Sequence, residues 1–357
     1  MMRLVTPSIE QLVPYEAGKP IEELTRELGI RDVVKLASNE NPFGPSPLAV
    51  EAAKMALASA HRYPDASAYG LRERLSAKLG VPMNEVVLGN GSNELLELLV
   101  RTFTTPDDHI VFAEPSFVVY RLAALAHGVS FTAVPLTNET HDLDRMLAAV
   151  TPNTRLVFIA NPNNPTGTAV SRKALERFLL AVPPHVIVAM DEAYIEYADA
   201  PDFPDCLELR GTRERLVVLR TFSKIYGLAA LRVGYGVAPP RLVDYMNRVR
   251  APFNVSTIGQ VAALAALDDT EHVVRSRREN ASERARLTRA LGALGVAVTP
   301  SQANFVYFDA RRPARPIYEA LLRKGVIVRP FAALPTSIRV TVGTPPENDR
   351  FLEAFGK

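Results

Sequence analysis

Cysteine is nearly absent from this chain, since Cys206 is the only one among 357 residues. A disulfide framework within the chain is therefore excluded, and the composition fits a reducing cytoplasm. No apolar run reaches the roughly 18 residues that a membrane span needs. The first residues, MMRLVTPSIEQLVPYE, also lack the charged and then apolar pattern of a signal peptide. We expect a cytoplasmic protein without membrane contact.

An excess of charge of either sign is also missing. The chain has 41 basic and 39 acidic side chains and a formal net charge of +2. This near-neutrality gives no electrostatic reason to expect nucleic acid as a partner. The six histidines are scattered without the paired spacing of metal ligands, so no metal site is predicted. Small molecules are the expected partners.

Between about residues 85 and 240, short apolar runs rich in β-branched residues alternate with segments of helical periodicity. This alternation predicts an α/β fold, with a large domain built on a mainly parallel seven-stranded sheet between helices. The predicted strands are 86–88, 109–112, 130–134, 155–159, 186–190, 216–220 and 233–237. Helices predicted between them include 93–102, 117–127 and 172–181.

After residue 240 the pattern changes and predicts a smaller α+β domain. Helical stretches at 239–249 and 255–295, the second broken near 268–270, precede the order strand, helix, strand, strand, helix. These last elements are expected at 303–309, 316–324, 326–329, 337–342 and 347–355. The irregular stretch 38–45 is expected to be a loop that crosses between domains or subunits. We predict an N-terminal arm and part of the small domain at 1–45, the large domain at 46–245 and the small domain at 246–357.

Unusual polar residues follow several predicted strands, at the edge where open α/β sheets bind ligands. The run LGNGSNE at 88–94 passes from a strand through glycines into a helix. Gly91, Ser92 and Asn93 would present N–H groups of the helix N-terminus to a phosphate. The alternative is that Ser92 only caps the helix.

Two further strands end in side chains suited to holding a heterocycle. The run NPNNPTG at 161–167 predicts a rigid loop, because each proline restricts the residue before it, and this loop would aim the Asn164 amide at an acceptor. A buried strand ends at Asp191, whose carboxylate needs a cationic partner such as a protonated ring nitrogen. Tyr194 would donate to an oxygen of the same ring. Glu192 is the alternative carboxylate, and a helix-capping role for Asp191 is another.

The run RTFSKIYGL at 220–228, followed by Arg232, combines an amine nucleophile with donors for a phosphate. An exposed lysine would be protonated and inert, whereas Lys224 beside Arg232, or joined in an imine, can lose its proton near neutral pH. Thr221, Ser223 and Arg232 would donate to the phosphate dianion.

Together, NPNNPTG, DEAY at 191–194 and TFSK at 221–224 with Arg232 resemble the fold-type I aminotransferases, and the resemblance covers nearly the whole chain. SNENPFGPS at 38–46, RYPD at 62–65 and GVIVR at 325–329 narrow it to the histidinol-phosphate aminotransferases. The resemblance implies pyridoxal 5′-phosphate (PLP) as cofactor, held by Lys224 as a Schiff base, with Asp191 at the pyridine nitrogen.

The resemblance assigns the remaining cofactor contacts as well. Asn164 and Tyr194 would hold the 3′-oxygen, and a homodimer is implied in which Tyr63 reaches the phosphate from the partner subunit. Phe117 would contact the ring. Many relatives carry tyrosine at this position, so Phe117 can still stack on the ring but cannot supply a hydroxyl group. The residues implied for the phosphate within the subunit are Gly91, Ser92, Asn93, Thr221, Ser223 and Arg232.

Arg329 and Arg339, on predicted strands of the small domain, are the candidates for a substrate anion, with Tyr15 as a further donor and Asn41 as a further substrate contact. The alternative is that both arginines are ordinary surface residues of their strands. The resemblance implies the phosphate of histidinol phosphate in one half-reaction and the carboxylate of glutamate in the other, with 2-oxoglutarate as amino acceptor. Three rivals remain. They are an aminotransferase for aromatic amino acids, a decarboxylase such as threonine-phosphate decarboxylase, and a non-catalytic protein that kept the fold.

Overall fold

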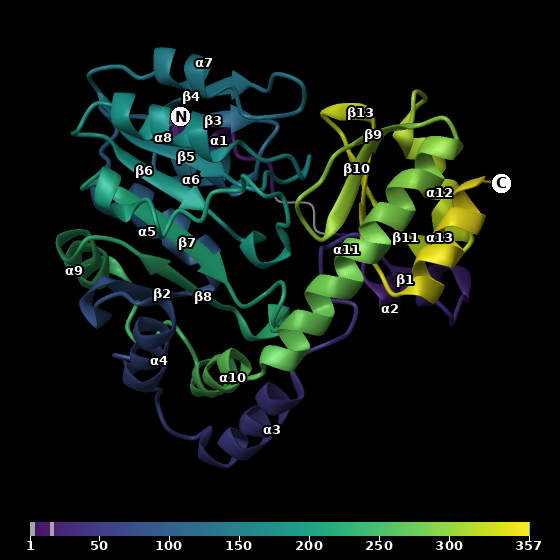
Figure 1. Cartoon of the computed structure of the whole chain (residues 1–357), viewed down its shortest axis with the longest axis horizontal. Coiled ribbons are helices and arrows are strands. Elements are labelled where there is room, and N and C mark those ends of the chain that lie inside the picture. Colours follow the sequence, from purple (N-terminus) through teal and green to yellow (C-terminus); the bar gives the residue numbers. More distant parts are fainter. Residues whose placement is uncertain (1–3, 15–17, 357) are drawn as a thin grey trace.

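The computed structural model of the chain describes residues 4–14 and 18–356, and a seven-stranded sheet forms the centre of its larger part (Figure 1). Neighbouring strands are parallel except around β8, which runs antiparallel to β2 and β7. Across the sheet, the order is β2 (Val86–Asn90), β8 (Val233–Val237), β7 (Leu216–Thr221), β6 (Ile187–Asp191), β5 (Thr154–Ala160), β3 (His109–Glu114) and β4 (Ser130–Pro135). The predicted mainly parallel seven-stranded sheet is confirmed.

Helices cover both faces of this sheet because side chains alternate along each strand. Val157 of β5 packs in a cluster with buried residues of α7 and α8, whereas its neighbour Phe158 packs with α5, α6 and α9. Strands β6 and β7 are buried along their whole length, as expected for central strands of a covered sheet. The helices of this part are α3 (Pro47–Ala56), α4 (Tyr69–Leu79), α5 (Gly91–Phe103), α6 (Val119–Ala126), α7 (Leu143–Ala148), α8 (Arg172–Ala181), α9 (Pro240–Val249) and α10 (Thr257–Asp268).

The smaller part is built on a four-stranded antiparallel sheet and its own buried core. Its strands follow in the order β12 (Arg329–Phe331), β13 (Leu334–Thr341), β10 (Phe305–Asp309) and β9 (Ala297–Thr299). Helices α12 (Ala314–Arg323) and α13 (Pro345–Gly356) pack against it, and α2 (Ile21–Leu28) lies nearby. Strand β1 (Val34–Lys35) pairs in parallel with β11 (Val326–Ile327), so this N-terminal segment joins the smaller part.

Helix α11 (Thr270–Ala293) runs from the larger part to the smaller one (Figure 1). Before it, α10 packs against α3 and α4 of the larger part. Along α11, Arg277 donates to the backbone of Ala198 in the larger part, while the C-terminal half of the helix packs on β9 and β10. The domain limits at residues 45 and 245 stay predictions; α10 packs on the larger part although it follows the second limit.

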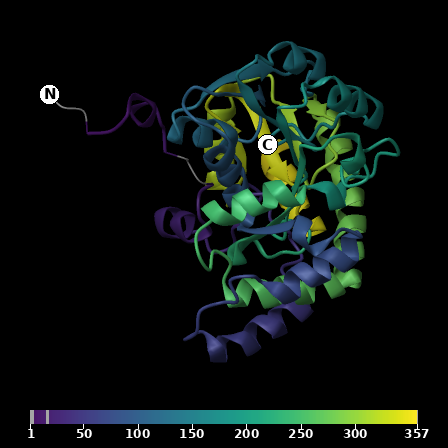
Figure 2. The same cartoon turned by 90° about the vertical axis from the view of Figure 1, so that its left-hand side faces the viewer.

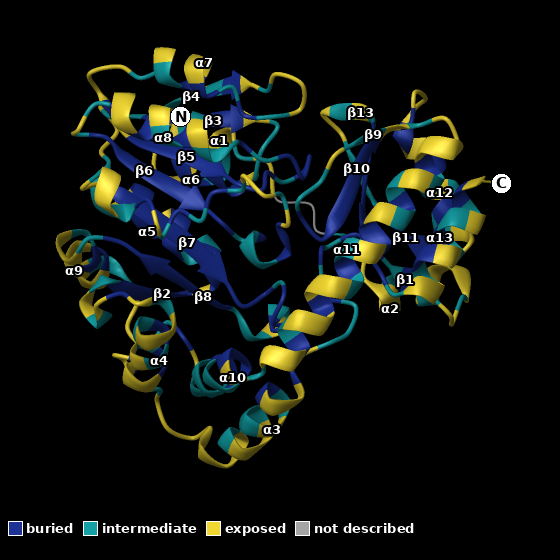
Figure 3. Ribbon diagram, in the orientation of Figure 1, coloured by how far each residue is buried: buried dark blue, intermediate teal, exposed yellow. Residues whose placement is uncertain are grey.

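Burial follows the layers, with the strands buried and the outer faces of the helices exposed (Figure 3). Seen from the side, the N-terminal segment with α1 (Pro7–Glu10) projects from the body of the molecule (Figure 2). Leu4 and Val13 in this segment are 98% and 77% exposed. In the described part of the chain, no helix is both long and apolar enough to cross a membrane.

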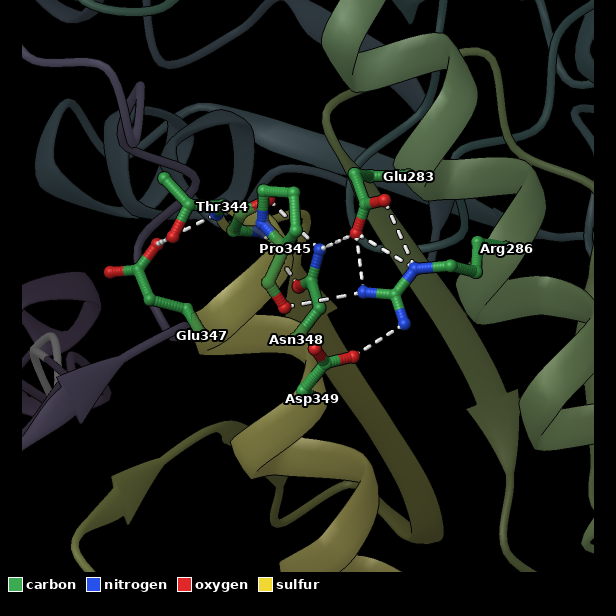
Figure 4. A network of polar contacts seen from close by, with 8 residues as sticks. Glu283, Arg286, Thr344, Pro345, Glu347, Asn348 and Asp349 are labelled. Carbon is green, nitrogen blue, oxygen red and sulfur yellow. Dashed lines mark hydrogen bonds and ion pairs between the residues drawn. The ribbon is translucent and has the colours of Figure 1, made fainter.

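A polar network fixes the chain just beyond the end of β13 (Figure 4). The fully buried Asn348 accepts from the N–H of Gly343 at 2.9 Å and donates to Glu283 Oε2 at 2.7 Å. Arg286 then pairs with both Glu283 and Asp349. Because a buried amide with satisfied partners holds one orientation, this network ties β13 and α13 to α11.

Candidate active site

A cavity of about 160 Å³ opens where β5, β6 and β7 end, between the two parts of the molecule. It collects most of the side chains that the sequence singled out, and it includes residues of β12 and β13. The lining residues are Gly18, Ala37, Ser38, Asn39, Ser92, Asn93, Phe117, Ala160, Pro162, Asn164, Asp191, Ala193, Tyr194, Thr221, Ser223, Lys224, Arg232, Arg329 and Arg339. Its position at the carboxyl ends of parallel strands is the usual one for ligand sites in α/β folds.

Lys224 reaches the cavity from the loop that follows β7. Its Nζ donates to the backbone oxygen of Ser38 at 3.3 Å and lies 5.6 Å from the centre of the Tyr194 ring. Burial of the ammonium, together with the positive charge of Arg339, lowers the pKa of Lys224 to about 8. An amine with this pKa is partly neutral near physiological pH, which a nucleophile and proton carrier needs.

Asp191 ends β6 with its carboxylate in the cavity wall and is 4% exposed. Tyr120 Oη donates to its Oδ2 at 2.9 Å, and the N–H of Ala193 donates to its Oδ1 at 3.3 Å. Burial raises the pKa of Asp191 to about 6 in spite of these two donors. A cationic ligand in the cavity would therefore stabilise the ionised carboxylate. No pattern in the sequence singled out Tyr120 for this role.

Glu192 is not the cavity carboxylate. It pairs with Arg220 at 2.8 Å and accepts from the N–H of Cys206 at 2.9 Å. Adjacent side chains at the end of a strand point to opposite faces, so Asp191 faces the cavity and Glu192 faces the core. Of the two carboxylates that the sequence left as alternatives, Asp191 lines the cavity and Glu192 does not.

The N-terminus of α5 and Arg232 form a cradle whose positive charge suits a phosphate. Gly91 has a φ of +70°, and a Cβ added there would lie 2.4 Å from Arg232 Nη2, so only glycine leaves room for the guanidinium. A Cβ on Gly234 would lie 2.4 Å from the backbone nitrogen of Ser92. Arg232 Nη1 also donates to Ser223 Oγ at 3.4 Å. Free N–H groups at a helix N-terminus beside an arginine suit a dianion.

Asn164 and Arg339 meet at the border between the two parts. Arg339 Nη1 donates to Asn164 Oδ1 at 2.6 Å, and its Nη2 donates to the backbone oxygen of Ala37 at 2.7 Å. The other asparagines of the same loop hold its shape. Asn161 accepts from the N–H of Val170, and Asn163 donates to Thr166 Oγ1. Only Asn164 of the three presents its amide to a charged group of the cavity.

Several predicted site residues lie outside the cavity. Asn41 donates to the backbone of Ile225 at 2.8 Å and to Ser276 at 3.0 Å, so its amide is used inside the protein. Tyr63 is 83% exposed and stacks on Phe253 with ring centres 4.7 Å apart. Gly91 lies behind Arg232 and shapes the cradle without lining the cavity. Tyr15 lies outside the described residues.

Residues 31–355 match the family model "Aminotransferase class I and II", and the chain belongs to this family. Histidinol-phosphate aminotransferase of Anaeromyxobacter sp. (strain Fw109-5) is 52% identical over 360 residues, which cover 100% of this chain and 99% of the relative. Histidinol-phosphate aminotransferase of Moorella thermoacetica is 49% identical, with 98% and 91% covered. The resemblance drawn from the motifs is thus confirmed.

Solved structures support the same assignment. Histidinol-phosphate aminotransferase from Sinorhizobium meliloti, in complex with PLP, superposes with a TM-score of 0.90 at 29% identity, covering 100% of this chain and 97% of that one. A mutant aspartate aminotransferase from Thermus thermophilus gives a TM-score of 0.84 at 26% identity, with 99% of each chain covered. The predicted fold class is confirmed.

Proposed function

We propose that this chain is a PLP-dependent enzyme that transfers the amino group of L-histidinol phosphate to 2-oxoglutarate, giving imidazole acetol phosphate and L-glutamate in histidine biosynthesis. One observation carries the proposal. Lys224, Asp191 and the anion cradle at the α5 N-terminus surround a single cavity. The identity of 52% to a histidinol-phosphate aminotransferase over the whole chain supports the substrate.

The cavity residues fit PLP. Asp191 is a buried acid with its pKa raised to about 6, and a protonated ring nitrogen is the partner that would keep it ionised. Asn164 and Tyr194 would hold the ring oxygen, and Phe117 would contact the ring. The cradle of Ser92, Asn93, Thr221, Ser223 and Arg232 would hold the phosphate.

PLP, when bound, supplies a ring that accepts electrons from the bond broken at the substrate Cα. The chain's own residues do the rest. Asp191 would keep positive charge at the ring nitrogen, because an ion pair at about 3 Å contributes roughly 5 kcal/mol at an effective dielectric near 20, before desolvation. Lys224, whose pKa is lowered to about 8, would take the proton from the substrate Cα and would also give it back, acting as the general base and then the general acid of the transfer.

Arg329 and Arg339 would bind the substrate anion, the phosphate in one half-reaction and a carboxylate in the other. Both also line a second cavity of about 570 Å³, which shares Phe117 and Asn164 with the first. Its wall includes the apolar side chains of Phe331 and Leu334. This cavity would therefore offer an apolar space for a ring-bearing side chain next to the arginines. A substrate with an anion at one end and a flat ring fits this pair of cavities.

Comparison of amino donors tests the proposal. Protein loaded with PLP is mixed with 2-oxoglutarate and with histidinol phosphate, phenylalanine or threonine phosphate, and glutamate formation is followed. We expect the highest kcat/KM with histidinol phosphate. A preference for phenylalanine would instead identify an aromatic aminotransferase, and release of carbon dioxide from threonine phosphate would identify a decarboxylase.

Arg339→Ala is expected to raise the KM for histidinol phosphate and for 2-oxoglutarate together, by roughly 10- to 100-fold, because each anion loses a charge-assisted hydrogen bond. Arg177→Ala is the control, since Arg177 lies on α8 and pairs at the surface with Asp144. Initial rates over a range of both substrates measure the effect. Unchanged KM values for both substrates would show that Arg339 is not the anion site.

We also propose a cytoplasmic homodimer in which Tyr63 completes the phosphate site of the partner subunit. Tyr63 and Phe253 form an exposed stacked pair, and Met55 nearby in sequence is 79% exposed. Exposed apolar side chains that lie together, as these two rings do, are typical of a surface that a partner covers. The projecting N-terminal segment, with Leu4 exposed, supports the same interpretation. Reduced and buried Cys206 fits the cytoplasm.

Tyr63→Phe is expected to weaken PLP retention in the dimer because a donor to the phosphate is lost. The shared site is tested with mixed dimers of Tyr63→Phe and Lys224→Ala subunits, assayed at limiting PLP. One site of each mixed dimer then has both side chains intact, so these dimers should regain about half the activity per dimer of the wild type. If mixing restores nothing, Tyr63 acts within its own subunit or not at all.

A further inference from the structure

Asn39 lies in the cavity wall and joins the two parts of the molecule. We propose that Asn39 is a positioning residue that directs the hydroxyl hydrogen of Tyr194 into the cavity. The inference rests on the proposed function, because the acceptor of that hydrogen is the ring oxygen of PLP. Asn39 lies two positions before Asn41, the residue of the SNENPFGPS motif that was predicted to contact the substrate.

A directed chain of hydrogen bonds sets the orientation of the Asn39 amide. The backbone N–H of Asn39 donates to Thr341 Oγ1 at 2.9 Å. Thr341 therefore accepts there, and its own hydrogen is available to Asn39 Oδ1 at 3.2 Å. With Oδ1 accepting from Thr341, Nδ2 is the atom that faces Tyr194 Oη, at 3.0 Å. An amide NH₂ group only donates, so Tyr194 is the acceptor.

The donor-to-acceptor direction of these hydrogen bonds decides where the Tyr194 hydroxyl can donate. Since its Oη accepts from Asn39, its own hydrogen points away from Asn39, and the hydroxyl belongs to a residue that lines the cavity. Asn39, Thr341 and Tyr194 are 1%, 3% and 4% exposed, which leaves little access for water to take over either contact. The arrangement therefore depends on these three side chains.

The backbone around Asn39 supports the arrangement. Asn39 has a φ of +56°, a left-handed conformation that asparagine tolerates better than most residues. Asn304 Nδ2 donates to the Asn39 backbone oxygen at 3.0 Å. Thr341 ends β13, two residues after Arg339, so the strand that carries the substrate anion site also sets the direction of Tyr194.

A hydrogen bond donated by Tyr194 stabilises negative charge on the ring oxygen. It thereby lowers the pKa of the Schiff-base nitrogen between Lys224 and PLP, which shares a proton with this oxygen. Losing the bond should raise the pH midpoint of the visible absorbance change of the PLP-loaded protein. A bond to a charged group is strong enough to move this midpoint by about one pH unit or more.

The test is a spectroscopic pH titration of PLP-loaded wild type, Tyr194→Phe, Asn39→Asp and the double variant. An ionised aspartate only accepts, so Asn39→Asp would draw the Tyr194 hydrogen away from the cavity. We expect Asn39→Asp and Tyr194→Phe to raise the midpoint by about one pH unit each, and the double variant to show no further rise. Thr341→Val should give a smaller rise in the same direction, and Thr341→Ser should restore the wild-type midpoint.

An unchanged midpoint in Asn39→Asp, or fully additive shifts in the double variant, would overturn the role of Asn39 while the proposed function stands. No shift in Tyr194→Phe would overturn it too, because Tyr194 would then not contact the ring oxygen. Failure of the wild type to take up PLP would instead reject the proposed function itself.

Discussion

Lys224→Ala is expected to lower the transamination rate by at least about 1,000-fold, the scale of losing a positioned general acid–base. The variant should also fail to form the covalent link to PLP, because no other amine lines the cavity among the described residues. Glutamate formation measures the rate. The intact mass after borohydride reduction measures the link, which should add cofactor mass to the wild type and none to the variant.

Lys78→Ala is the matched control for Lys224→Ala. Burial also lowers the pKa of Lys78, but its Nζ donates to the backbone oxygen of Leu267, away from the cavity. This variant should keep the activity and the borohydride-fixed mass of the wild type. If Lys224→Ala retained the covalent link, a different lysine would be the attachment point and the assignment of the site would be wrong.

The lowered pKa of Lys224 gives this link a pH dependence. Only the neutral amine attacks an aldehyde, and the pKa is lowered from its ordinary value of 10.5 to about 8. In cofactor-free protein, the rate of covalent PLP uptake should therefore rise with pH and reach half its maximum near pH 8. An exposed lysine would show the same rise about two units higher.

The strands of the larger sheet were predictable because their signal is strong and local. Runs such as 186–190 and 216–219 are wholly apolar and long enough to span a buried layer. Strand β8 (Val233–Val237) has the predicted ends, although its antiparallel direction comes from the whole topology and leaves no local mark. The site followed from the same logic, since polar residues at the ends of adjacent parallel strands must meet at one edge.

What the sequence did not reveal depends on contacts between distant segments. Strand β1 (Val34–Lys35) has two residues and exists only because β11 lies beside it. Tyr120 lies among the apolar residues of one helix face, so its sequence context does not mark it. Its hydrogen bond to Asp191 joins residues that are 71 positions apart in the sequence. In the same way, Asn39 and Asn41 are alike in the motif, and only the fold turns the first toward Tyr194 and the second toward Ile225.

Asp191→Asn should show separately what this carboxylate contributes to the reaction rate and how much its ionisation destabilises the folded protein. If Asp191 is the partner of the ring nitrogen of PLP, as we propose, removing its negative charge leaves that nitrogen without the group that keeps it protonated, and we expect the rate to fall by roughly 100-fold or more. The amide still accepts from Tyr120, so the loss reflects charge rather than geometry. Steady-state rates with saturating PLP measure this effect.

Cofactor-free Asp191→Asn protein should at the same time be more stable than cofactor-free wild type. The folded-state pKa of Asp191 is about 6, above its ordinary value of 3.8, so the folded protein binds this proton more tightly than the unfolded chain. Ionisation therefore destabilises the fold increasingly as the pH rises from about 4 to 6, by up to roughly 3 kcal/mol above that range. Thermal melting should show a higher Tm for the variant at pH 8 and little difference near pH 4.

Asp142→Asn is the control with the opposite electrostatics. Asp142 caps α7, and the donated N–H of Arg145 holds the pKa of its carboxyl below its ordinary value. Its replacement should not raise the Tm at pH 8. A higher Tm in both variants would point to a general effect of removing negative charge. No rise in Asp191→Asn would show that the unliganded cavity already supplies the carboxylate with a partner, and the need for a cationic ring nitrogen would lose its physical basis.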